Sequence, residues 1–465
     1  MIPRRTQLLA VASVVLAALS ALAHGVVALV PALRASVVAT QVALGLTALT
    51  ALCTTPLHPP DATRGDLWIG NGLYALFALF RALGFAVALR RGTLDEAQIQ
   101  LAFAGILHAP LLAAAARRAI AWGAVLAGIF GYALTGLALQ RAPMPASGAL
   151  FWMALTLVRW VQCEDFLHRA LPVTDHGRLA PWRHPGPWFI ALPLDLIANS
   201  RVMQLLLEPL PVVEMRSDIT EVIYVNYLVE AERLARLVPP GLELERVGPQ
   251  GRYALFTFLT YHHGHFGFSL LGPLRRLFPS PFQTNWRIHV FDPRTGMHGI
   301  RFVTNAIDYT VPAMGARMLS EGMPMHVLKS ASLTRDADGT MRLVLDPGRG
   351  SAPDVQATLR PAGEGATPYR ESHWDEPWRS CFADMRSFLE YCVPQDRAMD
   401  AQPWRRRVSR QEIHLGIPVE SCVPLAGVVR SEAARAIVGD AKPVCFLVPG
   451  VAFRFKLEDY DPMER

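Results

Sequence analysis

A lysine and two arginines lie on a run of predicted core strands beyond the middle of the chain. Lys329 is one of only three lysines, and a lysine amine in a dry pocket can attack a carbonyl carbon. Arg287 and Arg301 lie on neighbouring predicted strands, where two guanidinium groups could clamp a carboxylate through charge-assisted hydrogen bonds. The alternative is structural, with the arginines half-buried beside Glu321 or Asp308 and the lysine in a surface ion pair.

Five histidines lie on or near the same predicted strands: His262, His263, His265, His289 and His326. Imidazoles at short spacing can bind a transition metal. However, His262 and His263 point to opposite faces of a strand, and no acidic residue or cysteine is close to them in sequence. We therefore predict no metal site. His263 and His289 are assigned to the lining of a ligand pocket, together with Trp286, Met325 and the two arginines.

The sequence lacks the short motifs that bind nucleotides or present common nucleophiles. It contains no Walker loop, no GxGxxG and no GxSxG. The later cysteines show no CxxC spacing and are interpreted as reduced thiols. No cofactor is predicted. The net charge of +6 comes almost wholly from arginine, without a basic face interleaved with aromatic residues, so we predict no nucleic-acid partner.

The elements that position these side chains belong to a β-rich domain, which we place at residues 217–465. Its expected elements include strands at 285–291, 299–307 and 341–345, a helix at 311–321, and a strand at 325–334 that carries Lys329. Along that last strand Met325 and Lys329 share a face, about 13 Å apart. The pattern predicts a mainly antiparallel α+β domain with a curled, β-barrel-like sheet.

The first third of the chain has the composition of a membrane domain. From residue 7 to residue 162 the acidic residues are only Asp61, Asp66, Asp95 and Glu96. Apolar runs long enough to cross a bilayer occur at about 7–33, 35–53, 67–89, 99–116, 119–139 and 146–162. We therefore predict an α-helical polytopic membrane domain over residues 1–162, with about six spans.

The arginines that flank these spans predict the orientation. With the N-terminus inside, Arg4, Arg5, Arg64, Arg117, Arg118, Arg169, Arg178 and Arg183 are cytoplasmic, against Arg34, Arg90, Arg91 and Arg141 outside. The positive-inside rule then predicts a multi-pass protein of the bacterial inner (cytoplasmic) membrane, with its C-terminal domain in the cytoplasm. The first run also fits a cleavable secretory signal ending at Ala23. Because apolar sequence continues through Ala32, we prefer an uncleaved span.

Residues 163–216 are rich in proline, histidine and arginine and are interpreted as a linker. Their apolar stretch at 188–207 is interrupted by Pro193, Asp195 and Asn199, which argues against a seventh span. We predict an amphipathic helix that lies in the headgroup region, with the basic residues near anionic lipid. If the stretch did span, the C-terminal domain would lie on the other side of the membrane.

Several short phrases in the β-rich part occur in a recognisable order. They are Val225-Asn226-Tyr227-Leu228, the run from Leu237 to Glu243, Asn285-Trp286-Arg287, Gly322-Met323-Pro324, an Asp-Gly hairpin, and Ser387-Phe388-Leu389-Glu390. Together they resemble the acetoacetate decarboxylase-like superfamily, in its functionally uncharacterised bacterial branch, over about residues 218–460. The resemblance implies a curled antiparallel sheet enclosing a small-molecule pocket. The membrane third resembles no family that we identify.

One position departs from the family pattern. The decarboxylases have Gly-Phe-Pro-Lys at this place, and the resemblance implies that this lysine forms a Schiff base with a keto acid. Here the residues are Gly322-Met323-Pro324-Met325. A methionine cannot form a Schiff base, so Lys329 is left as a weak catalytic candidate.

We therefore predict a membrane-anchored protein that binds a small carboxylated or lipid-like ligand in a decarboxylase-like pocket without the Schiff-base lysine, and we favour a binding role over an enzymatic one. Two alternatives stay open. One is a membrane-associated lyase or hydrolase that uses the same pocket, and the other is a membrane transporter or sensor regulated by the β domain. The predicted partners are the lipid bilayer and a small molecule. The sequence identifies no protein partner.

Overall fold

The computed structural model describes residues 181–208, 210, 214–320, 322–362, 376–393, 396–402, 407–455 and 459–462, with scattered positions between 8 and 22 and between 160 and 168. The chain divides into two compact units, Met1–Pro172 and Val173–Arg465. The predicted membrane spans lie almost entirely outside the described residues. Within the described residues no single helix is long and apolar enough to cross a membrane. Two neighbouring helices, α7 (Trp188–Ala198) and α8 (Arg201–Leu207), are bent by 54° relative to each other. Taken together, but not singly, they are long and apolar enough, and this is a statement of length and composition only.

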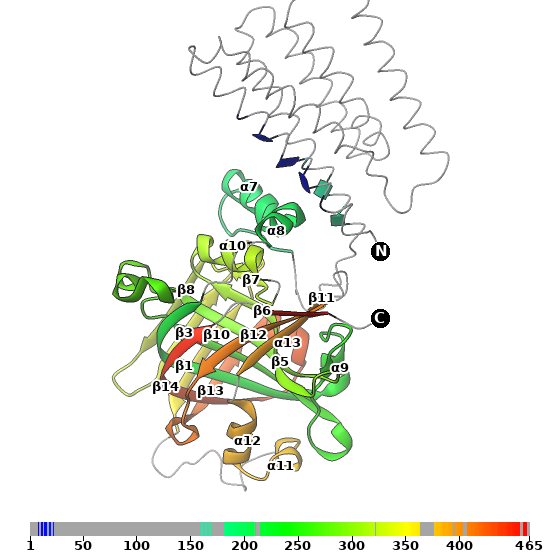
Figure 1. Cartoon of the computed structure of the whole chain (residues 1–465). Helices are drawn as coiled ribbons and strands as arrows, with labels where there is room; N and C mark the ends of the chain where they lie inside the picture. Colours follow the sequence, from blue (N-terminus) through cyan, green and yellow to red (C-terminus); the bar gives the residue numbers. More distant parts are fainter. Residues whose placement is uncertain are drawn as a thin grey trace, which may run out of the picture. The chain divides into compact units, whose positions relative to one another are not determined.

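The second unit is built on a large sheet (Figure 1). Its strands are β1 (Met215–Glu230), β2 (Glu243–Leu244), β3 (Tyr253–His262), β4 (Gly267–Phe268), β5 (Phe282–Asp292), β6 (Met297–Ile307), β7 (Met325–Val327), β8 (Ser330–Arg335), β9 (Met341–Asp346), β10 (Val355–Pro361), β11 (Arg397–Gln402), β12 (Arg407–Leu415), β13 (Val423–Arg430), β14 (Pro443–Phe455) and β15 (Asp459–Pro462). Apart from the β6–β7 and β6–β11 pairs, the pairings between these strands are antiparallel. The predicted mainly antiparallel β domain is confirmed.

The sheet curls because its path returns on itself. The strand order is β15-β12-β11-β6-β5-β3-β1-β14-β13-β10-β9-β8, and β12 also pairs with β14. The strands from β12 to β14 along this path therefore form a closed ring, and β13, β10, β9 and β8 continue beyond it. In the pairing that closes the ring, Ile413 of β12 lies opposite Phe455 of β14, and Leu415 lies opposite Phe453. This closure lets side chains from strands far apart in sequence face one space.

Short helices complete the unit. They are α9 (Ala231–Ala235), α10 (Thr310–Leu319), α11 (Trp378–Cys381), α12 (Met385–Cys392) and α13 (Glu432–Val438), with 3-10 turns η2 (Pro249–Gly251), η3 (Ser269–Leu277) and η5 (Val419–Ser421). The predicted helix at 311–321 is α10. Its N-cap residue, Tyr309, supplies no side-chain cap. The helix is held instead by packing against β6, β7 and α8.

The central strands bury both of their faces, so their two sets of alternating side chains enter different clusters. On β3 and β5, Phe258 and Trp286 lie in one core, with their rings stacked 4.8 Å apart. On the other face Leu259 and Tyr261 of β3 join Tyr224 of β1 in a second cluster. This alternation follows from the period of two in an extended strand. The second face is the one that borders the site described below.

The predicted strand at 325–334 is wrong as one continuous strand. It is divided into β7, which pairs with β6, and β8, which pairs with β9. Between them Leu328 N donates to Ile307 O, and Lys329 N donates to Asp346 O. The backbone thus changes its hydrogen-bonding partner from β6 to β9 within two residues. Met325 and Lys329 consequently do not share a face of one strand.

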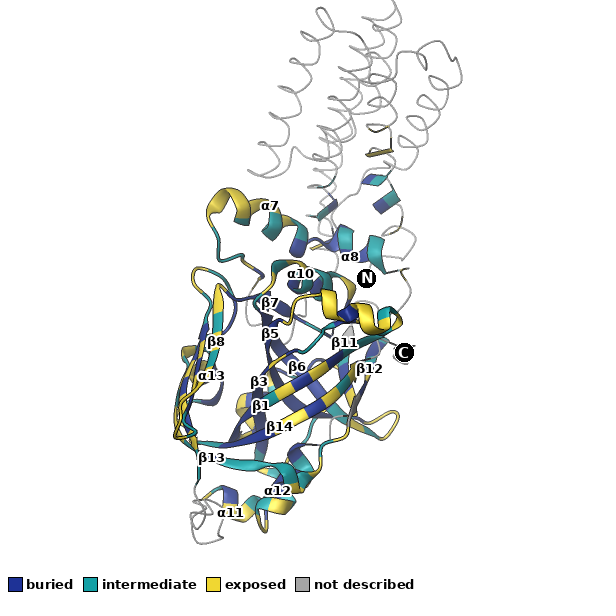
Figure 2. Cartoon of the chain, turned by 90° about the vertical axis from the view of Figure 1, so that its left-hand side faces the viewer, coloured by how far each residue is buried: buried dark blue, intermediate teal, exposed yellow. Residues whose placement is uncertain are grey.

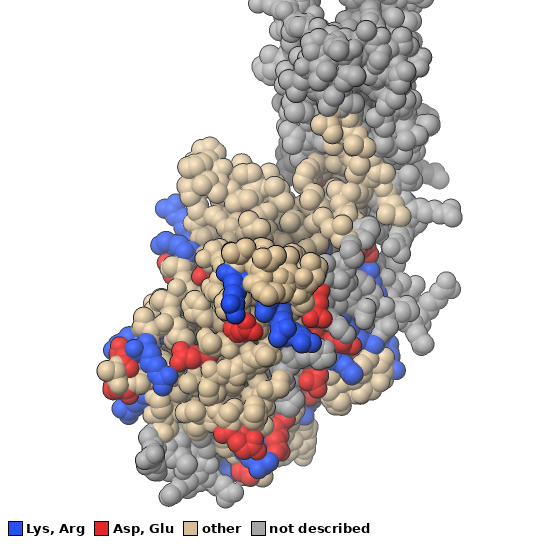
Figure 3. Space-filling model, turned by 60° about the vertical axis from the view of Figure 1, so that its left-hand side comes forward, with Lys and Arg blue, Asp and Glu red and all other residues tan. Residues whose placement is uncertain are grey.

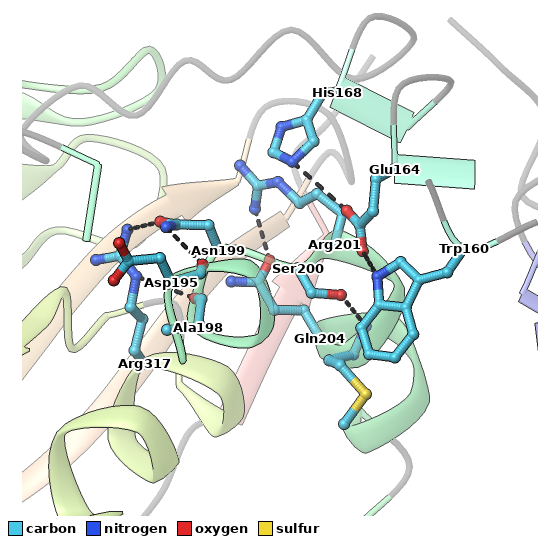
Figure 4. Close-up of polar contacts among 11 residues, drawn as sticks. Trp160, Glu164, His168, Asp195, Ala198, Asn199, Ser200, Arg201, Gln204 and Arg317 are labelled. Carbon is cyan, nitrogen blue, oxygen red and sulfur yellow. Dashed lines mark hydrogen bonds and ion pairs between the residues drawn. The ribbon is translucent and has the colours of Figure 1, made fainter. Parts of the chain in front are cut away.

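The C-terminal end of α7 contacts α10 through polar groups (Figure 4). Arg317 of α10 is buried and donates to Ala198 O and to Asn199 Oδ1, both at 3.2 Å. Asn199 Oδ1 also accepts from Trp182 N at 3.0 Å. Ala198, which accepts the hydrogen bond from Arg317, is the only buried residue of α7. The helix therefore exposes most of its apolar side chains, as Figure 2 shows in yellow.

Candidate functional site

A cavity of about 360 Å³ lies on the face of β1, β3 and β5 opposite Trp286. Its walls come from β1, β3, β5, β6, β12 and β14, and from the chain around η3 and α10. Most lining residues are apolar, including Leu259, Phe302, Ile307 and Met325. The described lining residues with polar side chains are Tyr224, Tyr261, His263, Gln283, Asn285 and Ser320, and none of the described lining residues is Lys, Arg, Asp or Glu. A cavity of this size and lining suits a small, largely apolar molecule.

Five buried or cavity-facing polar side chains form one hydrogen-bonded chain across β1, β3 and β5. Ser217 Oγ is 2.9 Å from His263 Nδ1, and His263 Nε2 is 2.8 Å from Gln283 Oε1. Gln283 Nε2 donates to Asn285 Oδ1 at 2.6 Å, and Asn285 Nδ2 donates to the Tyr261 hydroxyl at 3.0 Å. Because the Gln283 carbonyl can only accept, the ring hydrogen of His263 is on Nε2.

This chain ends at the cavity with a hydroxyl that can still donate. Tyr261 accepts from Asn285, and among the described residues no acceptor is paired with its own hydrogen. Burial raises the pKa of the Tyr261 hydroxyl well above its usual value, so the proton stays on the oxygen at neutral pH. Burial also lowers the pKa of His263 to about 4, which keeps the imidazole uncharged. The polar part of the cavity is therefore neutral, and the Tyr261 hydroxyl is one of its O–H groups.

The buried His263 predicts a loss of stability in acid. Its pKa is about 4 in the folded chain and about 6.5 when unfolded, so only the unfolded chain takes up the proton between these values. Stability is therefore full above pH 6.5, falls as the pH drops toward 4, and changes no further below that on account of this group. The loss assigned to His263 is roughly 3 kcal/mol.

Denaturant unfolding of the full chain from pH 7 to pH 4 measures this effect. His263→Asn, which does not titrate, should lose less stability over the range than the wild type. His289, whose pKa burial lowers to about 3, keeps titrating in both proteins and is the internal reference. Equal losses in the two proteins would contradict the assignment.

The structure brings two of the predicted site residues, His263 and Met325, into the lining of one cavity. It places Trp286 on the opposite face of β5, where its ring packs in the core and its Nε1 donates to Thr284 Oγ1 at 3.1 Å. His289 is buried and stacks on the Tyr391 ring at 4.7 Å. Neither Trp286 nor His289 lines the cavity.

The two arginines lie on opposite faces of the sheet. Arg287 is fully buried, donates to Cys392 O at 3.0 Å, and lies over the Tyr224 ring at 5.4 Å. Arg301 donates through Nε to Asp400 at 2.9 Å and through Nη1 to Leu237 O. The predicted clamp of both guanidinium groups on one carboxylate is therefore wrong.

The reason is the register of β5 and β6. A shift after Trp286 pairs Arg287 with Phe302 and Ile288 with Arg301. Paired residues point to the same face, so Arg287 lies on the cavity side, behind the ring of Tyr224, and Arg301 lies on the core side. Arg301 has the structural role that the sequence left as the alternative, with Asp400 as its acidic partner.

Lys329 lies away from the cavity. Its Nζ is 3.2 Å from Asp346 Oδ2, and its side chain is 61 % exposed. A solvated amine in an ion pair lacks the dry surroundings that a lysine nucleophile needs to attack a carbonyl carbon. This is the surface ion pair that the sequence analysis kept as the alternative to a catalytic role.

The other histidines of the run do not come together at one site. The His262 ring packs on Phe282 at 4.8 Å, and His265 Nδ1 lies 3.3 Å from Asp218 Oδ2 at the surface. In the part of the chain that the structure describes, no group of three or more His, Cys, Asp or Glu could hold a metal ion.

Sequence reasoning missed the polar side chains that join His263 to the cavity. Gln283, Asn285, Arg287 and His289 occupy every second position of β5, and an alternating polar row in a buried strand is a readable signal. It indicates that one face of the strand borders a polar feature. Tyr261 carries no such signal, since a tyrosine is ordinary in a strand.

No protein-family model matches this chain, and no curated protein matches it. Among solved structures it is similar to acetoacetate decarboxylase from Legionella pneumophila subsp. pneumophila str. Philadelphia 1, with a TM-score of 0.37 and 13% identity over 55% of this chain and 88% of that one. It is also similar to the enduracididine biosynthesis enzyme MppR, with a TM-score of 0.35 and 15% identity over 56% and 90%. An acetoacetate decarboxylase-like enzyme from Sphingomonas wittichii RW1 gives 0.37 and 9% over 56% and 96%.

Two of these names agree with the superfamily that residues 218–460 resemble. The N-terminal third is not recognised. At such identities and TM-scores the likeness says nothing about reaction or substrate.

Proposed function

We propose that the second unit binds an uncharged, largely apolar small molecule with one hydrogen-bond acceptor, and that it does so without chemical conversion. The observation that supports this is the cavity lining: apolar side chains on most sides, with the uncharged hydroxyl of Tyr261 among its few polar groups. Apolar walls stabilise an apolar ligand in proportion to the area removed from water. The fixed donor orients the ligand by its polar end.

The absence of charge among the described lining residues favours a neutral ligand over a carboxylate. Moving an ionised carboxylate into an apolar cavity is costly unless a cation pairs with it. The nearest candidate, Arg287, lies behind the Tyr224 ring and outside the lining. Of the two ligand classes predicted from sequence, the lipid-like one therefore fits better.

The lining also supports a binding role over the Schiff-base chemistry of the decarboxylases. The place where the family pattern has its lysine is occupied by the buried Met325, which lines the cavity. Among the described lining residues there is no amine. Ser320 Oγ accepts from Gln411 Nε2 at 2.6 Å. The imidazole of His263, which also lines the cavity, is hydrogen-bonded to Ser217 and Gln283. We therefore favour neither the lyase nor the hydrolase.

Membrane anchoring is part of the proposal. The acid-poor, apolar sequence from residue 7 to residue 162 has the composition of membrane spans. The helix α7, with Trp188, Phe189 and Leu196 exposed, has the surface of a helix that lies at a membrane. A protein so anchored would hold its cavity close to a source of apolar ligands, and we place the second unit in the cytoplasm.

The test is a loss of affinity that depends on the ligand's acceptor. Tyr261→Phe removes one O–H donor and should weaken binding of tritiated methyl laurate by about 5- to 10-fold, the value of one net hydrogen bond. The affinity for tridecane, which has no hydrogen-bond acceptor, is measured by displacement and should be the same in Tyr261→Phe and in the wild type. The measurement is scintillation proximity on the full chain in nanodiscs.

Tyr227→Phe is the matched control. Tyr227 lies on β1, which pairs with β3, but its side chain packs in the core that contains Trp286 and not in the cavity lining. It should bind both compounds like the wild type. If Tyr261→Phe weakened the ester and the alkane equally, or neither, the proposed polar contact would be wrong.

A further inference from the structure

The chain around η3 and the outer side of α10 form an apolar rim, which we call the lip. It consists of exposed apolar residues, namely Phe268, Leu270, Leu274, Leu277 and Phe278 of the η3 region and Val311 and Leu319 of α10. Leu270 and Leu277 are 77 % and 81 % exposed. Clustered apolar side chains at such exposure are uncommon on the surface of a soluble domain and mark an interaction site.

The η3 segment holds its leucines outward by burying a charged side chain. Arg275 is buried, donates to His265 O at 2.9 Å, and has its Nη2 3.6 Å from Asp218 Oδ2. A segment that packed on the domain in the ordinary way would bury Leu274 or Leu277 and expose the arginine. The observed inversion means that the domain fixes an apolar face toward its surroundings.

The lip surrounds the entrance of the cavity. Four of its residues, Phe268, Phe278, Val311 and Leu319, also line the cavity. Side chains that are both lining and exposed mark the place where the cavity reaches the surface. A ligand that enters between η3 and α10 therefore passes over the lip.

Charge and composition point to a lipid bilayer as the occupant of this surface. Neither residues 268–281 nor residues 309–319 contain an aspartate or glutamate, and the exposed charged residue of η3 is Arg276. A basic residue among exposed leucines suits anionic headgroups above an acyl layer. The neighbouring α7, which packs on α10, also exposes apolar side chains. In the view of Figure 3 the upper surface of this unit is mostly tan, and charged side chains lie beside and below it.

We propose that the lip inserts into the membrane and that the cavity exchanges its ligand directly with the bilayer. The ligand is then a neutral molecule that partitions into membranes, and it need not cross water to reach Tyr261. This inference rests on the proposed function for the identity of the cargo. The contact of the lip with lipid rests on the surface alone.

Photo-crosslinking from the lip tests the contact. The full chain carries benzoyl-phenylalanine in place of Leu277 and is reconstituted in phosphatidylglycerol and phosphatidylcholine vesicles. Irradiation should give phospholipid adducts at position 277. The matched control is Val428 on β13, which is 57 % exposed and should give none. Protein–protein adducts at position 277, or lipid adducts equal to those at 428, would overturn the proposal.

A kinetic readout tests the exchange. Leu270→Asp combined with Leu277→Asp should slow the uptake of methyl laurate from the vesicle bilayer about tenfold, since two carboxylates oppose insertion into the acyl layer. Unchanged uptake would overturn loading through the lip. Failure here is distinguishable from failure of the proposed function, because the benzophenone reports lipid contact whether or not the cavity binds an ester.

Discussion

Gly315→Phe is expected to lower the affinity for methyl laurate by at least about 100-fold, which corresponds to about 2.7 kcal/mol. Gly315 lies in α10 and lines the cavity, and a Cβ placed there meets no atom within 4 Å. A phenyl ring at this position would therefore extend into the cavity and occupy the volume that the ligand needs. The measurement is the scintillation proximity assay on the full chain.

Gly315→Ala is the matched control for this substitution. It adds one methyl group to the same site and should leave the affinity within about twofold, since the cavity keeps nearly all of its volume. Because alanine favours a helix interior over glycine, it should also raise the free energy of unfolding by about 0.5–1 kcal/mol. A folded Gly315→Phe protein that bound the ester normally would contradict the location of the site.

Asp400→Ala is expected to reduce the free energy of unfolding by about 3–5 kcal/mol, the range for breaking a buried ion pair. The guanidinium of Arg301 is buried, with its Nε 2.9 Å from Asp400 Oδ1. Removing the carboxylate leaves a positive charge in the core beside Leu237 O, with its main counter-charge gone. Denaturant unfolding of the full chain measures the change.

The double variant Arg301→Met and Asp400→Leu distinguishes two causes of the lost stability: the loss of the attraction between the two charges, and the burial of a charge without a partner. Replacing both partners by apolar side chains should restore stability to within about 2 kcal/mol of the wild type. Ligand affinity should not change in either protein, because neither residue lines the cavity. A cost below about 1 kcal/mol for Asp400→Ala would mean that solvent screens the pair.

Much of the sheet was predictable because its strands carry strong local patterns. The strands predicted at 285–291 and 299–307 lie within β5 and β6, and the segment at 341–345 lies within β9. The division between β7 and β8 was not predictable. It arises because the backbone N–H groups of Leu328 and Lys329 donate to carbonyl groups on different strands. Hydrophobic periodicity does not show which strand a given strand pairs with.

The candidate site was predictable in part. The family resemblance drew attention to Met325, and the histidine run drew attention to His263, and both line the cavity. The pairing of Arg287 with Arg301 failed because the register shift after Trp286 puts them on opposite faces. The cavity itself depends on β12 pairing with β14 and on η3 and α10 lying around one opening. These contacts are long-range and leave no local signature.

The central claim is that the cavity beside Met325 holds an apolar molecule drawn from its surroundings. The most direct measurement uses the full chain in proteoliposomes that contain a long-chain methyl ester with a diazirine at the chain end. After irradiation, digestion and mass spectrometry locate the adducts. We expect adducts on cavity residues such as Met325 and Phe302, and these adducts should fall to background in Gly315→Phe. Adducts confined to residues outside the cavity, or equally abundant in Gly315→Phe, would contradict it.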